Sequence, residues 1–309
     1  MAMIPESFNE VDKVIISRHI KHITSADAET DFLKLKEIGF SAPLTSSRSR
    51  VGNNVVDFFT FKERLNTKGK YNMNYFEFLT NLEEFKKKKF IDNMLTYYRD
   101  VKNKNKTKNE YIVLKEVYNI CISAINIFRP LVAMQIYVKY NPVTVLDFTC
   151  GWGGRLVGAC ALNVPNYIGI DINSNLKTAY SEMIHFLSLH SQTKAQVLIE
   201  DAVMFDYSSI EYDMVLTSPP YYFLEKYSNN NAYGNSKEEM NKYFYIPLFS
   251  NTFKHLKSGG HYCLNINKEI YDNVCVPILG IAQETIELKK SKRQNDYGEY
   301  IYIWVKTII

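Results

Sequence analysis

Residues 143–155 read Val-Thr-Val-Leu-Asp-Phe-Thr-Cys-Gly-Trp-Gly-Gly-Arg, an apolar, β-branched run followed by a glycine-rich loop. Such a run bounded by glycine predicts a short buried strand, and the segment 156–163 that follows is helix-like. Glycine lets the backbone approach a bound molecule closely, and the N-terminus of a helix favours negative charge. The stretch therefore predicts a strand–loop–helix unit of an α/β domain whose loop binds a cofactor.

Further apolar runs continue this pattern at 167–171, 195–200, 212–218 and 261–267, with helix-like segments at 174–190 and 237–257. Strands that alternate with helices predict a parallel sheet with right-handed crossovers. The runs at 286–291 and 299–308 have no helix between them and predict a hairpin whose final strand enters the sheet antiparallel. Residues 141–309 thus predict an α/β, Rossmann-like domain with a mixed seven-stranded sheet and a C-terminal β-hairpin.

Residues 1–140 lack this alternation and predict a mostly helical region. Apolar residues at steps of three and four indicate one helix from Lys108 to Tyr140, interrupted at Arg129-Pro130. This region holds 23 basic and 16 acidic residues, whereas residues 141–309 hold 14 and 17. Its lysine clusters, Lys86–Lys89 and Lys102–Lys108, are candidate phosphate contacts, and the alternative is ordinary solvated charge. We therefore divide the chain into a candidate nucleic-acid recognition region at 1–140 and a catalytic domain at 141–309.

The composition limits the class of protein. With 309 residues, of which 46% are hydrophobic and 23% charged, the chain is predicted to be globular rather than disordered or fibrous. No uncharged apolar stretch is long enough to span a membrane, and the N-terminus lacks the pattern of a secretory signal, which predicts a soluble, intracellular protein. The five cysteines form no Cys-x-x-Cys pair, so we expect neither a disulfide framework nor a metal site.

Asp147 stands near the end of the first predicted strand, and two further acidic residues stand at the ends of the next two predicted strands. Asp171 closes the run 167–171, and Asp201 follows the run 195–200. The carboxyl ends of parallel strands share one edge of the sheet, where an acid can accept hydrogen bonds from ribose hydroxyls. The glycine loop and the two acids together predict one adenosine-containing ligand. Leu156 replaces the third glycine of the dinucleotide fingerprint, and no nucleoside-triphosphate loop is present, which disfavours nicotinamide cofactors and ATP.

The fourth run ends in Thr-Ser-Pro-Pro-Tyr-Tyr at 217–222. Two prolines fix the backbone and cannot donate hydrogen bonds, so the Ser218 side chain and the Pro219 carbonyl present acceptors at fixed positions. Tyr221 or Tyr222 adds an aromatic face. Acceptors beside an aromatic plane suit a base that carries an amino group, and the alternative is a structural Pro-Pro turn with a core tyrosine.

The order DFTCGWGG, GID, EDA and TSPPYY resembles class I S-adenosylmethionine-dependent methyltransferases of the type that methylates exocyclic amino groups of DNA bases. The segments RVGNNVVDFFTFKERLNTKGKYN and SPPYYFLEKYS also resemble DNA methyltransferases of phages and large DNA viruses, which implies the cytoplasm or nucleus of a host. The resemblance implies S-adenosylmethionine as the cofactor, its methionine part on the glycine loop, its ribose on Asp171 and its adenine on Asp201. The implied cofactor-binding residues are Asp147, Phe148, Thr149, Gly151, Gly153, Asp171, Ile172, Asp201 and Ala202, and the implied catalytic residues are Ser218, Pro219, Pro220 and Tyr221.

Two departures from the family pattern affect the details. Phe148 and Thr149 occupy the positions where family members have Pro and Phe, and Ser218 replaces the Asp or Asn of many adenine-specific members. Because Ser-Pro-Pro-Tyr is commoner among cytosine-N4 enzymes, both N6 of adenine and N4 of cytosine remain open. In the family an element before the glycine loop often touches the cofactor carboxylate, and Asn126–Arg129 is the candidate here.

The resemblance implies direct methyl transfer to a base that is flipped out of double-stranded DNA. Acceptors at Ser218 and Pro219 would take the two N–H bonds of the amino group, and the Tyr- and Asn-rich segment 222–245 is predicted to close over the base. No catalytic cysteine is required, and no Pro-Cys pair is present for cytosine-C5 chemistry. The alternatives are an RNA base, a glutamine side-chain amide, or a non-catalytic nucleic-acid-binding subunit, and a homodimer or partner subunit is left open.

Overall fold

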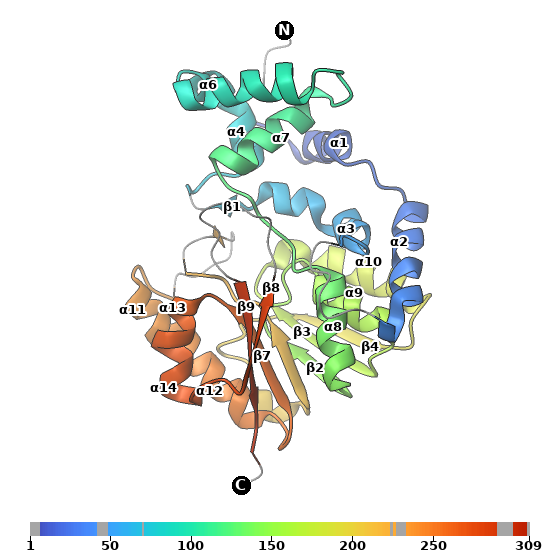
Figure 1. The fold of residues 1–309 in the computed structure, drawn as a ribbon, viewed down its shortest axis with the longest axis vertical. Coiled ribbons are helices and arrows are strands. Elements are labelled where there is room, and N and C mark those ends of the chain that lie inside the picture. Colours follow the sequence, from blue (N-terminus) through green and yellow to red (C-terminus); the bar gives the residue numbers. More distant parts are fainter. Residues whose placement is uncertain are drawn as a thin grey trace. The chain divides into compact units, whose positions relative to one another are not determined.

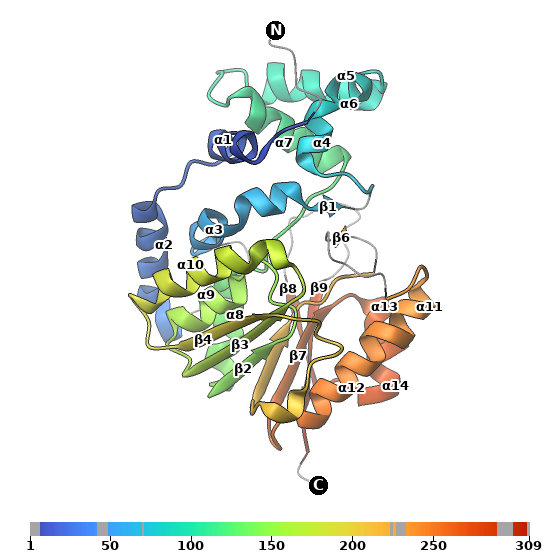
Figure 2. The same ribbon diagram turned by 180° about the vertical axis from the view of Figure 1, so that it is seen from behind.

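The structure is a computed structural model that describes residues 7–41, 49–69, 71–222, 225–226, 233–288 and 299–307. Its residues form two compact units, which are drawn in Figures 1 and 2. The first unit takes residues from 1–25, 60–126 and 223–228, and the second takes residues from 26–59, 127–222 and 229–309. The sequence division at residue 140 follows the change from helix to strand, and as a boundary between folding domains it stays a prediction.

The second unit contains a seven-stranded sheet. Its strands are β2 (Thr144–Asp147), β3 (Asn166–Asp171), β4 (Lys194–Ile199), β5 (Met214–Thr217), β7 (His261–Ile266), β8 (Glu284–Leu288) and β9 (Glu299–Val305), in the order β4-β3-β2-β5-β7-β9-β8. Strands β4, β3, β2, β5 and β7 are parallel, whereas β9 lies antiparallel between β7 and β8. This sheet confirms the predicted α/β, Rossmann-like fold with a mixed seven-stranded sheet. The predicted link between the last two strands, 292–298, lies outside the described residues.

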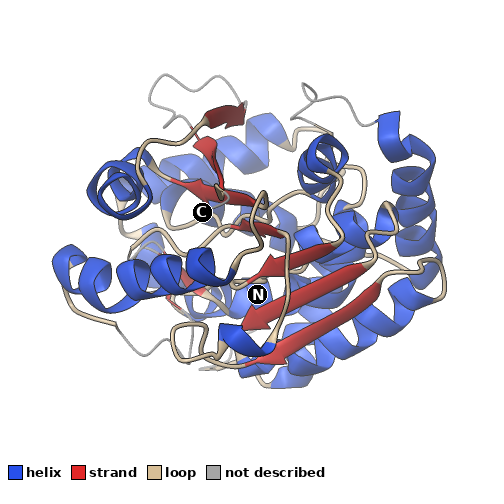
Figure 3. Cartoon of the chain, turned by 90° about the horizontal axis from the view of Figure 1, so that it is seen from below, coloured by secondary structure: helices blue, strands red, loops and turns tan. Residues whose placement is uncertain are grey.

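The strand order reverses between β2 and β5, because the chain builds outward from β2 through β3 and β4 and then continues on the other side of β2. In open α/β sheets, ligands bind at such a reversal, outside the carboxyl ends of the strands. The glycine loop follows β2 and the Ser-Pro-Pro-Tyr segment follows β5. The topology therefore brings the two strongest features of the sequence to one edge of the sheet, whose strands are the red arrows of Figure 3.

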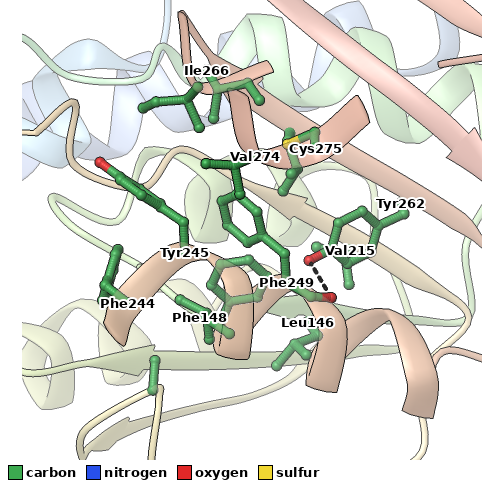
Figure 4. Close-up of a cluster of buried hydrophobic side chains, with 14 of the residues drawn as sticks. Leu146, Phe148, Val215, Phe244, Tyr245, Phe249, Tyr262, Ile266, Val274 and Cys275 are labelled. Carbon is green, nitrogen blue, oxygen red and sulfur yellow. Dashed lines mark hydrogen bonds between the residues drawn. The ribbon is translucent and has the colours of Figure 1, made fainter. Parts of the chain in front are cut away.

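Helices cover this sheet and close a buried core. They are α8 (Pro130–Tyr140), α9 (Gly154–Ala161), α10 (Lys177–Ser188), α11 (Lys237–Met240), η5 (Asn241–Tyr245), α12 (Ile246–His255), α13 (Lys268–Ile270), η6 (Tyr271–Cys275) and α14 (Val276–Leu279), with short helical turns η3 (Ser174–Leu176) and η4 (Tyr207–Ser209). One extensive core cluster joins Leu146, Val215 and Tyr262 of the sheet to Phe249 and Val274 of the helices (Figure 4). Burial of these large apolar side chains fixes the helical segment after β5 on the sheet.

Where the structure describes residues 1–140 they are mostly helical, as predicted, and the first unit is mostly helical too. Its helices are α1 (Glu10–Ile20), α4 (Tyr75–Thr80), α5 (Leu82–Lys86), α6 (Lys89–Thr96), η2 (Tyr97–Lys102) and α7 (Glu110–Cys121), beside the short antiparallel pair β1 (Lys68–Gly69) and β6 (Glu225–Lys226). Helices α2 (Ser25–Ile38) and α3 (Asn53–Asn66) run across the division between the units, and η1 (Gly39–Ser41) follows α2. None of the described helices is long and apolar enough to cross a membrane.

The prediction of one helix from Lys108 to Tyr140, interrupted only at Arg129-Pro130, is wrong in the extent of the helix. The structure has two helices there, α7 and α8, and residues 122–129 between them are not helical. Arg129 has φ −69° and ψ 134° because the residue before a proline is driven out of the helical region. The β-branched residues Ile122, Ile125 and Ile127 lower the helix propensity of the segment 122–128, which precedes Arg129. The break is therefore longer than the proline alone indicates.

Candidate active site

Asp147 ends β2 at the centre of a buried polar cluster. Its side chain is fully buried, and Oδ2 accepts hydrogen bonds from Arg155 Nε at 2.7 Å and from the Tyr167 hydroxyl at 2.6 Å. Oδ1 accepts from the Thr217 hydroxyl at 2.8 Å. Burial, together with the nearby Asp147 carboxylate, raises the pKa of Tyr167, so the phenol remains a donor. The Asp147 carboxylate thus accepts hydrogen bonds from three internal donors, and it supports the glycine loop from its buried side.

The same cluster holds the loop after β2. Arg155, almost fully buried at the start of α9, donates from Nη2 to the carbonyl of Thr149 at 2.5 Å. The hydroxyls of Thr149 and Thr217 lie 2.6 Å apart. Because the Thr217 proton is directed to Asp147, Thr149 is the donor in this pair, and its own hydroxyl oxygen keeps lone pairs for a ligand. The Asp147–Arg155 ion pair therefore joins the end of β2 to the start of α9, and the hydrogen bonds of Thr217 add the end of β5.

The glycines of the loop are required by its geometry. Gly151 and Gly153 have φ of +59° and +81°, the left-handed region that glycine adopts without strain. A Cβ on Gly154 would lie 1.8 Å from the carbonyl oxygen of Phe128, so the backbone of the segment before α8 passes directly against the loop. Phe128 belongs to the element Asn126–Arg129 that the resemblance placed beside the cofactor carboxylate.

Asp171, the last residue of β3, faces the glycine loop. Its Oδ2 accepts from the Gly151 N–H at 2.6 Å and its Oδ1 from the Asn173 N–H at 2.9 Å, while the Tyr180 hydroxyl donates to the Gly151 carbonyl. Burial raises the pKa of the Asp171 carboxyl to about 6, although the two N–H donors oppose the shift. Each carboxylate oxygen has a further lone pair, so Asp171 can still accept from the hydroxyls of a sugar.

Asp201 follows β4 and is half-buried. Its Oδ1 accepts from the Val203 N–H at 2.9 Å, and its Oδ2 accepts from the Tyr233 hydroxyl. Ala202 beside it is buried, and Ile172 after β3 is half-buried. Tyr233 belongs to the segment predicted to close over a base; residues 223–224 and 227–232 of that segment lie outside the described residues, and its closure stays a prediction.

The side chains of Phe148 and Asp147, two of the predicted cofactor residues, both turn away from the surface of the glycine loop. The Phe148 ring is fully buried in the core of Figure 4, with its centroid 6.1 Å from that of Phe249 and 6.5 Å from that of Tyr262. Successive side chains along a strand point to opposite faces, so Phe148 points to one side and Asp147 to the other. Neither side chain faces the loop surface, and a direct contact to a cofactor by either residue must come from its backbone.

Two hydroxyls after β5 converge on one amide. The Ser218 hydroxyl and the Tyr221 hydroxyl each donate to Asn265 Oδ1, both at 3.0 Å. Asn265 is buried in β7, and its Nδ2 donates to the carbonyl of Tyr300 at 3.0 Å. Because that bond fixes which end of the amide faces the hydroxyls, the Ser218 proton points to Asn265 Oδ1, and the Ser218 oxygen keeps lone pairs as an acceptor. The Tyr221 hydroxyl also lies 3.2 Å from the Asn265 carbonyl and 3.4 Å from a carboxylate oxygen of Glu299, so its single proton has three acceptors within reach.

Tyr245 holds the backbone of the same segment from the core. Its fully buried side chain donates to the Pro220 carbonyl at 2.5 Å and accepts from the Tyr222 N–H at 2.9 Å. Tyr222 has φ +51°, a conformation that bulky residues rarely adopt, and its hydroxyl lies 3.1 Å from Asn241 Oδ1. Tyr222 is therefore a core residue, and of the two tyrosines proposed as an aromatic face only the half-buried Tyr221 remains a candidate.

The described residues around this site include no cluster of metal ligands. In the part of the chain that the structure describes, no group of three or more His, Cys, Asp or Glu could hold a metal ion. All five cysteines are free thiols. Burial raises the pKa of the Cys150 thiol in the glycine loop, so this residue stays protonated and is a poor nucleophile.

Sequence reasoning missed Asn265 and Arg155, and it placed Tyr245 in the segment predicted to close over a base, whereas the structure buries Tyr245 fully in the core. A usable indication for Asn265 is a polar amide within the apolar run 261–267, because a buried amide needs a specific partner. For Arg155 it is a basic residue in the first turn of a helix, where the helix dipole disfavours positive charge. Tyr245 is one of 23 tyrosines, and nothing in its neighbourhood distinguishes it from the others.

Solved structures are similar to this chain, whereas no protein-family model and no curated protein matches it. One is TrmN from Thermus thermophilus, 17% identical, with 57% of this chain and 48% of TrmN covered and a TM-score of 0.42. The chain therefore spans about half of TrmN. Another is an rRNA methylase from Streptococcus thermophilus, 13% identical, with 60% and 100% covered and a TM-score of 0.40. A third is an S-adenosylmethionine-dependent methyltransferase from Clostridium acetobutylicum, 15% identical, with 64% and 82% covered and a TM-score of 0.35.

Proposed function

We propose that this chain transfers a methyl group from S-adenosylmethionine to the exocyclic amino group of a base in double-stranded DNA, at N6 of adenine or N4 of cytosine. The observation that carries the proposal is the Ser218 hydroxyl, whose proton is directed to Asn265, so that its oxygen and the neighbouring Pro219 carbonyl would be the acceptors. An amino group on a base offers two N–H donors, and oriented acceptors are what it requires. A substrate without such donors would leave these acceptors unpaired.

The residues after β2, β3 and β4 fit S-adenosylmethionine. The loop Thr149–Gly153 allows close backbone approach and would hold the methionine part, and Asp171 has lone pairs available for the ribose hydroxyls. Asp201, with Ile172 and Ala202, would hold the adenine. When bound, the cofactor supplies an electrophilic methyl group on a sulfonium. Asp147 and Phe148 support the loop from its buried side.

The chain itself orients the amino group. The lone pair of a base amino group is delocalised into the ring, which makes the nitrogen a weak nucleophile. Acceptance of its two N–H bonds by Ser218 Oγ and the Pro219 carbonyl favours a pyramidal nitrogen with its lone pair out of the ring plane. The next carbonyl, that of Pro220, is already taken by Tyr245, which favours Pro219 as the second acceptor. The ring of Tyr221 would stack on the flipped base.

The experiment offers labelled S-adenosylmethionine with unmodified duplex DNA, single-stranded DNA or RNA, followed by mass spectrometry of the nucleosides. Ser218→Ala removes the oriented acceptor, and we expect it to lower kcat by about 10²-fold. Ser188→Ala is the matched control, because the exposed Ser188 hydroxyl donates only to the His185 carbonyl of its own helix. Its activity should equal that of the unaltered chain.

Each outcome has a separate meaning. N6-methyladenine or N4-methylcytosine in DNA, lost in Ser218→Ala, would support the proposal and identify the base. The same product in RNA alone would replace DNA by RNA as the substrate. Cofactor binding without transfer to any nucleic acid would refute the enzymatic proposal and favour a non-catalytic subunit. Equal activity of the two serine variants would refute the role of Ser218.

A further inference from the structure

The continuous helix formed by α6 and η2 in the first unit carries an exposed apolar stripe. Ile91 and Leu95 are buried in the core of that unit. Phe90, Tyr97 and Val101 are 61%, 41% and 59% exposed. Residues spaced by seven and four positions lie on one side of a helix, so these three form a row next to the buried face. Large apolar side chains exposed in a row are typical of a binding surface.

Lysines flank this row, and the structure divides them into two groups. Lys86 and Lys87 pair with Glu83 and Glu84, each at 2.6 Å, which neutralises them locally. The second group makes no ion pair within the described residues and consists of Lys88, Lys89, Lys102, Lys104 and Lys106. The sequence alone does not distinguish the two groups. The ion pairs show which lysines have a carboxylate partner within the described residues and which do not.

Charged lysines and exposed rings occur together at the end of this helix. The ammonium group of Lys102 lies 5.7 Å from the centroid of the Tyr97 ring, and Lys104 and Lys106 follow in the exposed turn after η2. Over residues 88–106 the five lysines and Arg99 outnumber the two acidic residues, Asp92 and Asp100, so positive charge is in excess. We name Phe90, Tyr97, Val101 and the five unpaired lysines the α6–η2 face; the helix is labelled α6 in Figure 1.

We infer that the α6–η2 face docks a nucleic-acid strand, with phosphates on the lysines and bases or sugars on the exposed rings. Lysines supply the attraction to phosphates, and aromatic side chains supply stacking that tolerates any base. An acidic protein would be attracted by the same charge, but stacking on exposed rings favours the nucleic acid. The inference rests on the proposed function, because it names where the first unit holds the polymer whose base is methylated.

The test measures binding of a short fluorescent oligonucleotide, duplex or single-stranded, to the full chain at several salt concentrations. Each lysine–phosphate contact contributes about 0.7 to the slope of log affinity against log salt for a single strand, so replacement of Lys102, Lys104 and Lys106 by alanine should reduce that slope by about two. Phe90→Ala should weaken binding by at least about fivefold. The matched control replaces Lys86 and Lys87 by alanine and should bind as the unaltered chain does.

Cofactor affinity and methyl transfer are measured in parallel, which separates two kinds of failure. If the unaltered chain binds and methylates nucleic acid while the triple-lysine and Phe90 variants match the control, the α6–η2 face is overturned and the proposed function stands. If the unaltered chain binds no nucleic acid and instead methylates or binds an acidic protein, the inference about the α6–η2 face and the proposed function are both refuted. Loss of oligonucleotide binding in the triple-lysine variant, with cofactor affinity unchanged, supports the inference.

Discussion

Tyr245→Phe tests whether the Ser-Pro-Pro-Tyr segment is held in place from the core. The phenylalanine ring still fills the cavity, but the Pro220 carbonyl and the Tyr222 N–H lose their partner. Each buried polar group left without a partner costs about 1–3 kcal/mol, so a segment that stayed in place would lose about 2–6 kcal/mol. Tyr222 in its left-handed conformation stores about 1–3 kcal/mol of strain, which is maintained only by surrounding contacts.

The segment is therefore expected to relax. Tyr222 leaves the left-handed region, the strain is released, and the net loss in the free energy of unfolding falls to about 1–3 kcal/mol. Relaxation displaces Ser218 and Tyr221 from Asn265, and a displacement of about 1 Å at reacting groups lowers the rate by about 10²-fold. Affinity for S-adenosylmethionine should change little, because Tyr245 makes no hydrogen bond to the glycine loop or to Asp171 within the described residues.

Tyr212→Phe is the matched control. Tyr212 is equally buried, and its hydroxyl donates to the Thr252 carbonyl at 2.6 Å, away from the Ser-Pro-Pro-Tyr segment. Urea unfolding should give similar losses of stability for the two variants, whereas steady-state kinetics should show a large fall in kcat for Tyr245→Phe alone. Equal kcat values for the two variants would refute the reasoning and leave Tyr245 as an ordinary core residue.

Two further predictions concern the cofactor side of the site. Because the pKa of the Asp171 carboxyl is raised to about 6, affinity for S-adenosylmethionine should rise between about pH 5 and pH 7 as the proton is lost, and Asp171→Asn should abolish this rise in calorimetric titrations. Between about pH 4 and pH 6 the cofactor-free chain should lose stability, because the folded state, with a pKa of about 6, holds that proton more tightly than the unfolded state, whose pKa is near 3.8. Arg155→Met leaves Asp147 buried without its cation and should lower the free energy of unfolding by about 3–5 kcal/mol in urea titrations. The double variant with Asp147→Asn should recover part of the loss, and a loss below about 1 kcal/mol for Arg155→Met would contradict the role of the pair.

The fold was largely predictable, because its indications are local. Apolar runs of strand length, helical periodicity between them and glycine at the turns are properties of neighbouring residues, and every predicted strand of the second unit is present. The insertion of β9 between β7 and β8 also agrees with the expected antiparallel final strand. The helix break before Pro130 was underestimated, because several moderate propensities add up over residues 122–129 without any one of them being decisive.

The sequence by itself determined the order of strands and helices, the glycine loop after β2, and the positions of Asp171 and Ser218 at strand ends, since these follow from local conformational preference and topology. Only the tertiary structure decided which of these side chains turn into the core and which line the candidate site. Asp147, Phe148 and Tyr222 turn into the core, whereas Asn265 reaches Ser218 from 47 residues away and Tyr245 reaches Pro220 from 25 residues away. Such contacts depend on strand register and on the packing of distant elements, and neither is recorded in the spacing of residues along one segment.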